Sequence, residues 1–458
     1  MPREGGPDAL VQRRGRRETW DTVTPPGGIA PGPGLPGGSE EAEEAEDPVH
    51  RGTNLPRMEE FNQTVILDTI RRDEHGLSRA QVARRTGLSA QTITNISRRL
   101  IAQGLVVEGG GITRPGPGRP GTRMRLNPTG RYAVGVHLDP ALLTCVVLDL
   151  TGTVVASSQR STPVPDQAHD AVAGIVADIE ALLSGSGIDR DLVLGVGIAS
   201  PGPIDVARGL VLDPPHLPGW HQVPLRDEVA RLTGLDVLLD KDVIAAASAH
   251  TWTRTWHDSS DFAFVYLGTG VAVSLVLRGE VLRGVSGNAG EAGHVVVDTD
   301  GPVCACGQRG CLGACVSAQG LVDAFVAAGL PAPPGVDRSD ARQAYETLRA
   351  MTRAADEGDE RAVQVLVTAG RRLGLGAVTF CDLLDLDTVI LGGPLWGLIA
   401  PHALPQIGPL VEARHVLRPV HPVEVVGSHL GLEVGAVGGA CLVLSQALSP
   451  RTASLLLG

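Results

Sequence analysis

The sequence predicts an α/β protein in which a small helical module precedes a larger body of two similar lobes. Three observations carry this prediction. Apolar residues recur at helical spacing between positions 59 and 101, and two short strand patterns follow them. From Arg131 onward strand and helix patterns alternate, and one pattern of strands and turns occurs twice. With 458 residues the chain is long enough for about two to four domains and a sizeable core.

Residues 1–57 are predicted to be a disordered tail. They contain a Pro/Gly-rich stretch, followed by an acidic run from Ser39 to Asp47. Such a composition buries too little apolar surface to offset the entropy lost on ordering. A regulatory or partner-binding tail is the alternative to a plain one. The organised sequence begins at Met58, which is a candidate for the true start of the protein.

Residues 58–130 are predicted to form a winged helix-turn-helix. The first helix begins at Glu59, buries one apolar face and is expected to end at Gly76. Ser78 and Ser89 stand where the N-caps of a second and a third helix belong, with a tight turn between these helices. Two strand patterns, at 104–107 and 123–127, complete the module as a wing.

Charge is divided unevenly along the chain. The whole chain has a net charge of −12, which taken alone argues against a polyanion as partner. Residues 58–130, however, contain 11 Arg against 6 Asp and Glu. A compact basic module is the electrostatic signature of a protein that binds a phosphate backbone. We therefore expect the N-terminal module to bind nucleic acid.

The start of the third helix is predicted to read double-stranded DNA in the major groove. Short polar side chains there can reach base edges, and two arginines one turn later are placed to contact phosphates. The predicted DNA-binding residues are Ser89, Gln91, Thr92, Asn95, Arg98 and Arg99, with Arg119 in the wing. Taken singly, Ser89 could be only a helix cap, and Gln91 and Asn95 could be only a solvated face.

Arg119 lies in a stretch, 114–120, that alternates Pro and Gly between arginines. Such a slim, extended segment lets arginine side chains enter a narrow minor groove. An ordinary flexible linker is the alternative interpretation.

Two segments of the larger body share one pattern of strand, tight turn, strand, tight turn and strand. They cover residues 133–155 and 262–282. Such a duplication indicates two lobes of like topology that face a cleft, as in the ribonuclease H-like fold of actin and hexokinase. We therefore predict that residues 131–458 form one two-lobed α/β domain.

One imidazole and three thiols lie close together in the sequence and predict a structural zinc site. The four ligands of the predicted site are His294, Cys304, Cys306 and Cys311. This set supplies the four soft or borderline donors of a closed tetrahedral Zn²⁺ site. Free buried cysteines are the alternative, and Cys315 is a second-choice ligand. The remaining cysteines, Cys145, Cys381 and Cys441, lie in apolar runs and are expected in the core.

Several ordered motifs together resemble the ROK family of repressors, open reading frames and kinases. They are the segment 197–205, Pro-Gly-Trp at 218–220, Asp-Lys-Asp at 240–242, Gly-Glu-Ala-Gly-His at 290–294, and the cysteines that follow. The resemblance covers roughly residues 60 to 445. Family members with an N-terminal winged helix are mostly sugar-responsive transcriptional repressors, and those without one are mostly sugar kinases. The resemblance therefore implies a repressor of carbohydrate-related genes that binds an operator in double-stranded DNA.

The nucleotide-binding motifs of the family are degraded in this chain. Family kinases open with Asp-x-Gly-Gly-Thr, whose backbone holds ATP phosphates, whereas residues 137–141 here read His-Leu-Asp-Pro-Ala. Both glycines are missing, and Pro140 has no N–H to offer. The second phosphate turn begins with Gly268-Thr269-Gly270 but continues without further glycines. We predict that the protein binds no ATP productively and is not an enzyme.

The sugar pocket implied by the resemblance is also altered. Asp242 matches the family's general base and is expected to be a relic, whereas Lys241 stands where the family has Asn. Glu291 and His294 match residues that hold sugar hydroxyls, and Gly313 replaces a further Glu. The expected effector-binding residues are therefore Lys241, Asp242, Glu291 and His294. Lys241, the only lysine of the chain, either neutralises and fills the pocket or clamps an anionic effector such as a sugar phosphate.

The assembly expected from these parts is a cytoplasmic homodimer or homotetramer, because a near-palindromic operator calls for two-fold symmetry. No secretory signal or membrane-spanning helix is expected, so a membrane partner is not predicted. Two other functions stay open. One is an effector-independent DNA-binding scaffold, and the other is a bifunctional ATP-dependent sugar kinase.

Overall fold

The computed structural model describes residues 55–112, 121–162, 168–215, 217–253 and 260–450. The predicted disordered tail lies outside these residues except for its last three positions, and so does Arg119. The structure confirms the predicted fold class. A winged helix-turn-helix is followed by two α/β lobes of equal topology.

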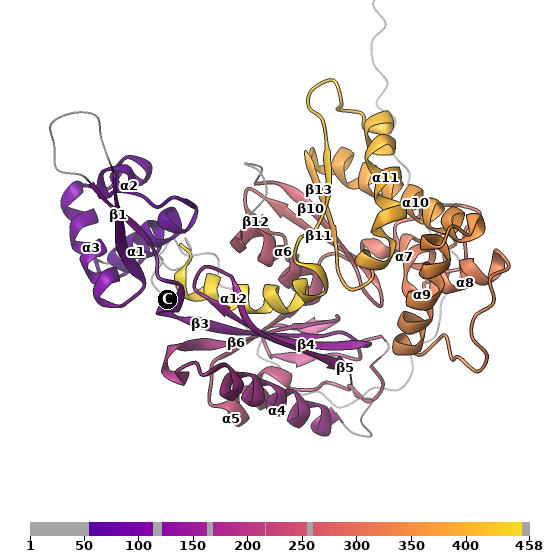
Figure 1. The fold of residues 1–458 in the computed structure, drawn as a ribbon, viewed down its shortest axis with the longest axis horizontal. Coiled ribbons are helices and arrows are strands. Elements are labelled where there is room, and N and C mark those ends of the chain that lie inside the picture. Colours follow the sequence, from indigo (N-terminus) through magenta and orange to yellow (C-terminus); the bar gives the residue numbers. More distant parts are fainter. Residues whose placement is uncertain (1–54, 113–120, 163–167, 216, 254–259, 451–458) are drawn as a thin grey trace, which may run out of the picture. The chain divides into compact units, whose positions relative to one another are not determined.

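The winged helix consists of three helices and a two-stranded ribbon (Figure 1). Its elements are α1 (Leu55–Arg71), α2 (Arg79–Thr86), α3 (Ala90–Ala102), β1 (Val106–Ile112) and β2 (Gly121–Leu126). Ser78 forms a capping box with Gln81 at the start of α2, and Ser89 caps α3. The first helix begins at Leu55 rather than at Glu59, so the last three positions of the predicted disordered tail are helical. It ends at Arg71 rather than at Gly76, since the chain turns there and Leu77 pairs with Met124 of β2.

The first lobe is built on a five-stranded sheet in the order β5-β4-β3-β6-β9. Its strands are β3 (Tyr132–Leu138), β4 (Leu142–Asp149), β5 (Val154–Ser161), β6 (Val193–Ser200) and β9 (Val237–Lys241). Strands β3, β4 and β5 pair antiparallel, whereas β6 and β9 are added in parallel. Helices α4 (Ala168–Ser186) and α5 (Leu225–Thr233) cover the outer face of this sheet (Figure 1). The short pair β7 (Ile204–Asp205) and β8 (Leu210–Val211) lies between β6 and α5 in sequence.

The second lobe repeats this topology in the order β12-β11-β10-β13-β14. Its strands are β10 (Phe262–Leu267), β11 (Val271–Leu277), β12 (Glu280–Val281), β13 (Thr388–Gly392) and β14 (Glu424–Gly427). Again three strands pair antiparallel and two are added in parallel. The helices that belong to this lobe are α7 (Leu312–Val316), α8 (Ala318–Ala327), α9 (Ala341–Asp356), α10 (Glu360–Leu384) and α11 (Trp396–Arg414).

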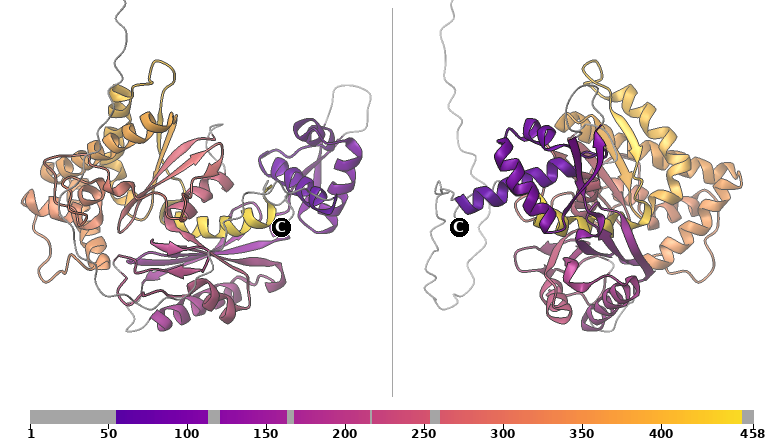
Figure 2. Two further views of the ribbon diagram at one scale, coloured as in Figure 1. Left: turned by 180° about the vertical axis from the view of Figure 1, so that it is seen from behind. Right: turned by 60° about the vertical axis from the view of Figure 1, so that its left-hand side comes forward.

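Two helices, α6 (Asp242–Thr253) and α12 (Val434–Leu448), lie between the sheets (Figure 1, Figure 2). They pack closely because glycines replace bulkier residues at their contacts. A Cβ on Gly438 would lie 2.0 Å from the carbonyl oxygen of Ala245 in α6. A Cβ on Gly197 of β6 would lie 1.8 Å from the carbonyl oxygen of Gly439. Only glycine therefore permits this approach of backbones.

The segment Gly431–Leu448, which includes α12, is the one described helix long and apolar enough to cross a membrane, with a mean hydropathy of 1.5. We did not expect such a segment from the sequence. In the structure 67% of it is buried inside the protein, where α12 contacts α6 and the first sheet. Its apolar composition therefore has a sufficient explanation in the core of the fold.

We expect Gly438→Ala to lower the free energy of unfolding by about 1–3 kcal/mol, because the added Cβ would force α6 and α12 apart. Gly397→Ala is the matched control, since Gly397 is exposed in the first turn of α11 and a Cβ there meets nothing within 4 Å. Alanine is the better helix former, so the control should be neutral or stabilising by up to about 1 kcal/mol. Denaturant unfolding followed by circular dichroism measures both, and equal stability of the two variants would contradict the close packing.

Candidate functional site

The N-terminal end of α3 presents two amides on its exposed face. Gln91 and Asn95 are one helical turn apart, and Gln91 Nε2 donates to Asn95 Oδ1 at 3.1 Å. Ser89 and Thr92 are engaged locally, because the Ser89 hydroxyl accepts from the Thr92 backbone N–H and lies 2.9 Å from its hydroxyl. Gln91 and Asn95 are thus the predicted base-reading residues that are turned outward as a pair.

The two arginines further along α3 differ in their surroundings. Arg98 is exposed and has no ion pair among the described residues. Arg99 pairs with Glu59 of α1 at 3.0 Å, and its Nε is buried without an acceptor. A phosphate would have to compete with Glu59 for Arg99 but not for Arg98.

Lys241, at the end of β9, is enclosed between the two lobes and is only 3% exposed. Its Nζ lies 2.5 Å from Oε1 of Glu291, 3.3 Å from the carbonyl oxygen of Asn288 and 3.4 Å from that of Ala289. An ammonium has three N–H donors, so each donor has an acceptor. The Glu291 side chain is 64% exposed, which means that the ion pair reaches the surface on that side.

Four further polar contacts join the first lobe to the second. The pairs are Asp240 with Arg283 at 3.0 Å, Ile204 N with Asn288 Oδ1 at 2.8 Å, Asp139 Oδ1 with Thr269 Oγ1 at 3.2 Å, and His137 Nε2 with the Tyr266 hydroxyl at 3.1 Å. These contacts therefore bridge the two lobes at several points.

The two phosphate turns of the fold meet each other directly. Asp139 Oδ1 accepts from the Ala141 backbone N–H at 2.8 Å and from Thr269, while Oδ2 accepts from the Thr269 backbone N–H at 3.4 Å. The N–H and hydroxyl donors at these turns, which a phosphate would need to find free, are thus bonded to the Asp139 carboxyl. The intervening Pro140 has no N–H.

Asp242, the first residue of α6, directly follows Lys241, the last residue of β9. Burial raises the pKa of its carboxyl to about 7, although the charge of Lys241 opposes this shift. Asp242 is therefore next to the predicted effector residues in space, as well as in sequence. Glu291 is linked to His294 by a single turn, in which the His294 N–H donates to the Glu291 carbonyl oxygen at 3.2 Å.

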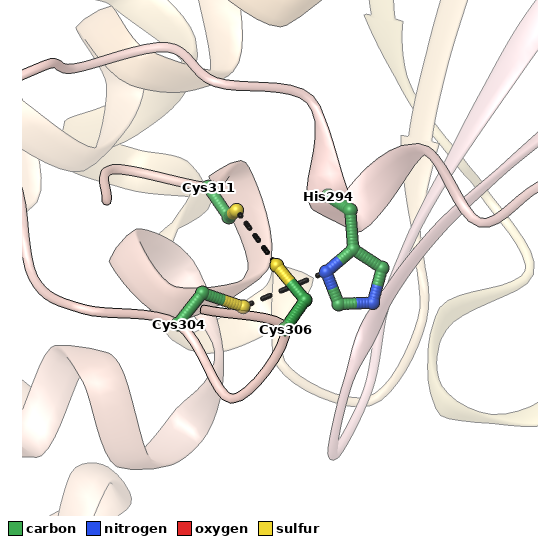
Figure 3. A group of neighbouring side chains, drawn as sticks. All are labelled: His294, Cys304, Cys306 and Cys311. Carbon is green, nitrogen blue, oxygen red and sulfur yellow. Dashed lines mark hydrogen bonds between the residues drawn. The ribbon is translucent and has the colours of Figure 1, made fainter. Parts of the chain in front are cut away.

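The predicted zinc ligands come together as one cluster (Figure 3). The donor atoms of His294, Cys304, Cys306 and Cys311 all lie within 4.8 Å of one another. Cys306 Sγ is 3.7 Å from Cys311 Sγ, and Cys304 Sγ is 3.5 Å from His294 Nδ1. Sulfurs bound to Zn²⁺ at about 2.3 Å in a tetrahedron lie about 3.8 Å apart, so the cluster fits this ion. Cys315 is buried in α7 and is not a member of the cluster.

Sequence reasoning missed the partners that hold the cleft closed. Asn288, Arg283 and Thr269 were not singled out as contacts of the first lobe, although all three contact it. Their partners lie more than 40 residues away in the sequence. Only the duplication of the two lobes, which places corresponding turns opposite each other, gave a signal for them.

Comparison with known proteins finds a family match for both parts of the chain. Residues 134–446 match the ROK family, and residues 54–111 match the MarR family. The chain is 26% identical over 401 residues to a putative xylose repressor of Caldicellulosiruptor sp. (strain Rt8B.4), covering 86% of this chain and 98% of that protein. It is 30% identical to a glucokinase of Thermotoga maritima, covering 68% of this chain and 96% of the glucokinase.

A solved structure gives the same result. The crystal structure of a ROK family transcriptional regulator, a homologue of the E. coli MLC protein, superposes with a TM-score of 0.67 at 25% identity, covering 86% of this chain and 97% of that one. Repressor relatives thus match both the winged helix and the two lobes, whereas the glucokinase matches the lobes. The chain belongs to the ROK family.

Proposed function

We propose that this protein is a DNA-binding transcriptional regulator, a repressor of carbohydrate-related genes. The observation that carries the proposal is the exposed Gln91 and Asn95 pair on α3, within a winged helix joined to a ROK domain. Amides at this position of a recognition helix are suited to bond adenine in the major groove. Two relatives that cover 86% of this chain, named a putative xylose repressor and a xylose repressor, support the same function.

Catalysis is not part of the proposed function. Asp139 and Thr269 bond each other where the two phosphate turns meet, and Pro140 removes a backbone donor. The alternative is a protein that both regulates transcription and phosphorylates a sugar, because glucokinases are among its relatives. The contacts of Asp139 favour a regulator over an enzyme, because ATP would have to break them before it could bind.

The state of Lys241 favours the interpretation that it fills the pocket. Its three donors are all used by Glu291 and two backbone carbonyls, so an additional anion would have to displace Glu291 from Lys241. A neutral sugar would face the same ion pair. This arrangement supports, as a second candidate, an effector-independent regulator whose large domain is a scaffold for dimerisation.

Assembly and metal complete the proposal. A homodimer or homotetramer in the cytoplasm would place two copies of α3 on an operator with two-fold symmetry. A structural Zn²⁺ would be held by His294, Cys304, Cys306 and Cys311. Its coordination bonds would fix the position of the loop that carries Glu291. The single turn from Glu291 to His294 supports this link between metal and cleft.

We expect Asn95→Ala to weaken binding to a duplex selected from a random pool by about 1–3 kcal/mol, because a bidentate contact to a base is lost. Gln103→Ala is the matched control, since Gln103 is exposed at the opposite end of α3 and should bind as the wild type does. Fluorescence anisotropy at fixed salt measures both affinities. Failure of the wild-type protein to select any sequence would reject the proposed function.

The protein should not bind ATP with magnesium at micromolar concentration, because Asp139 is held by Ala141 and Thr269. Isothermal titration calorimetry measures this directly, and a coupled assay with several hexoses tests turnover. A micromolar dissociation constant, or turnover above background, would favour the bifunctional kinase.

Cys306→Ser should remove the bound metal, because Cys306 is exposed and supplies one of four ligands without otherwise filling the core. Cys315→Ala is the control and should retain one equivalent of zinc, since Cys315 lies outside the cluster. Metal content by atomic spectrometry separates the two variants. Loss of metal from Cys315→Ala, with retention in Cys306→Ser, would reverse the ligand assignment.

A further inference from the structure

Helix α6 runs from the floor of the cleft to the winged helix and is buried for most of its length. Every residue from Val243 to His250 is buried, and Trp252 near its end is 3% exposed. Its 12 residues span about 18 Å at 1.5 Å per residue. A helix packed in this way between two sheets moves as a rigid unit with its neighbours.

The C-terminal end of α6 contacts Arg71, the last residue of α1. The Arg71 guanidinium donates to the carbonyl oxygen of Trp252, and it lies 4.3 Å from the centroid of the Trp252 ring. The last four carbonyls of a helix lack partners within the helix, and a cation there is favoured by the helix dipole. Arg71 thus caps α6 and stacks on its aromatic residue at the same time.

Arg71 is the buried member of two neighbouring arginines, and it is the one that contacts Trp252. The Arg71 side chain is 7% exposed, and the loss of hydration lowers its pKa although Asp68 is bonded to it at 2.6 Å. The neighbouring Arg72 shares Asp68 at 2.5 Å, but its side chain is 42% exposed. A charge as deeply placed as that of Arg71 requires its partners, whereas Arg72 can be solvated.

Apolar packing continues along the same path. One cluster of buried apolar residues contains Ile66, Leu67 and Ile70 of α1 together with residues of α6 and α12. The polar contact of Arg71 therefore sits at the edge of a continuous core.

The opposite end of α6 begins beside the cleft. Lys241 precedes its first residue, and Asp242 is that residue. A change in the ion pair between Lys241 and Glu291 therefore acts on the start of a rigid helix whose other end holds α1.

We propose that α6 transmits the state of the Lys241 to Glu291 ion pair to the winged helix, with Arg71 as the positioning residue that couples α6 to α1. This inference rests on the proposed function, since the coupled output is DNA binding. It assigns to Arg71 and Trp252 a regulatory role that is separate from contact with DNA or effector.

A double-mutant cycle tests the coupling without an effector. Lys241→Met removes the ammonium from the cleft, and Arg71→Met removes the cap while Arg72 continues to pair with Asp68. Arg72→Met is the matched control, because it lies next to Arg71 and shares its acid partner without contacting Trp252. The full chain is used, and each variant is first checked for a wild-type circular dichroism spectrum and cooperative thermal unfolding.

Two readouts are measured for every variant. One is the dissociation constant for the duplex selected by the wild-type protein, and the other is amide hydrogen exchange within α2 and α3. Lys241→Met is expected to change at least one readout about fivefold or more in the wild-type and Arg72→Met backgrounds. In the Arg71→Met background the same substitution should change both readouts by less than about twofold. Arg71→Lys, which keeps the charge over the Trp252 ring, should restore part of the effect.

Two outcomes overturn the proposal. One is an equal effect of Lys241→Met with and without Arg71, and the other is no effect of Lys241→Met in the wild-type background. If Arg71→Met does not fold, Arg71→Lys decides the question, and full coupling equal to that of the wild type would then contradict a role for the guanidinium geometry. Absence of DNA binding by every variant would reject the proposed function alone, since hydrogen exchange still measures the coupling.

Discussion

The buried ammonium of Lys241 is the constraint on which the arrangement of the two lobes depends. A cation removed from water must be matched by acceptors, and here Glu291 and two backbone carbonyls of the second lobe supply them. Because Lys241 belongs to the first lobe, these acceptors can reach it only when the lobes are closed on each other. The ion pair between Asp240 and Arg283 and the hydrogen bond between Asp139 and Thr269 also hold the two lobes together.

The same contacts between the lobes support the proposal that this domain functions without nucleotide. Where ATP would enter, donors at the two phosphate turns already bond Asp139, and the cleft floor already holds a charged pair. The hydrogen-bonding and charged groups that could bind a ligand are thus bonded to other residues of the protein. Under the proposed function, the two lobes support the winged helix and are coupled to it through α6, while the winged helix contacts DNA.

Much of the architecture could be predicted from the sequence because local patterns determine it. The spacing of apolar residues and the caps at Ser78 and Ser89 indicated the helices of the winged helix, and the repeated turns indicated the duplicated lobes. Four metal-binding residues, one His and three Cys close together in the sequence, predicted a cluster that the fold brings together. The sequence did not reveal that α12 is a buried helix between the two sheets, because its burial depends on contacts with distant parts of the chain.

Contacts between distant residues could not be predicted in this way. Arg71 and Trp252 lie 181 positions apart, and no local pattern indicates that one caps the helix of the other. The ion pair between Arg99 and Glu59 likewise depends on how α1 crosses α3. From the sequence alone, Arg98 and Arg99 were therefore predicted to contact phosphates equally well. The predicted roles of the DNA-binding and effector residues remain predictions, since geometry places these side chains but does not show what they bind.

The most direct measurement of the central claim uses the fact that Lys241 is the only lysine of the chain. The native protein is treated with an amine-acylating ester, and modification of Lys241 is followed by mass spectrometry with and without denaturant. Enclosure of the ammonium predicts that Lys241 stays unmodified in the native protein and reacts only after unfolding. Acylation of native Lys241 at the rate of a solvent-exposed lysine would contradict the account.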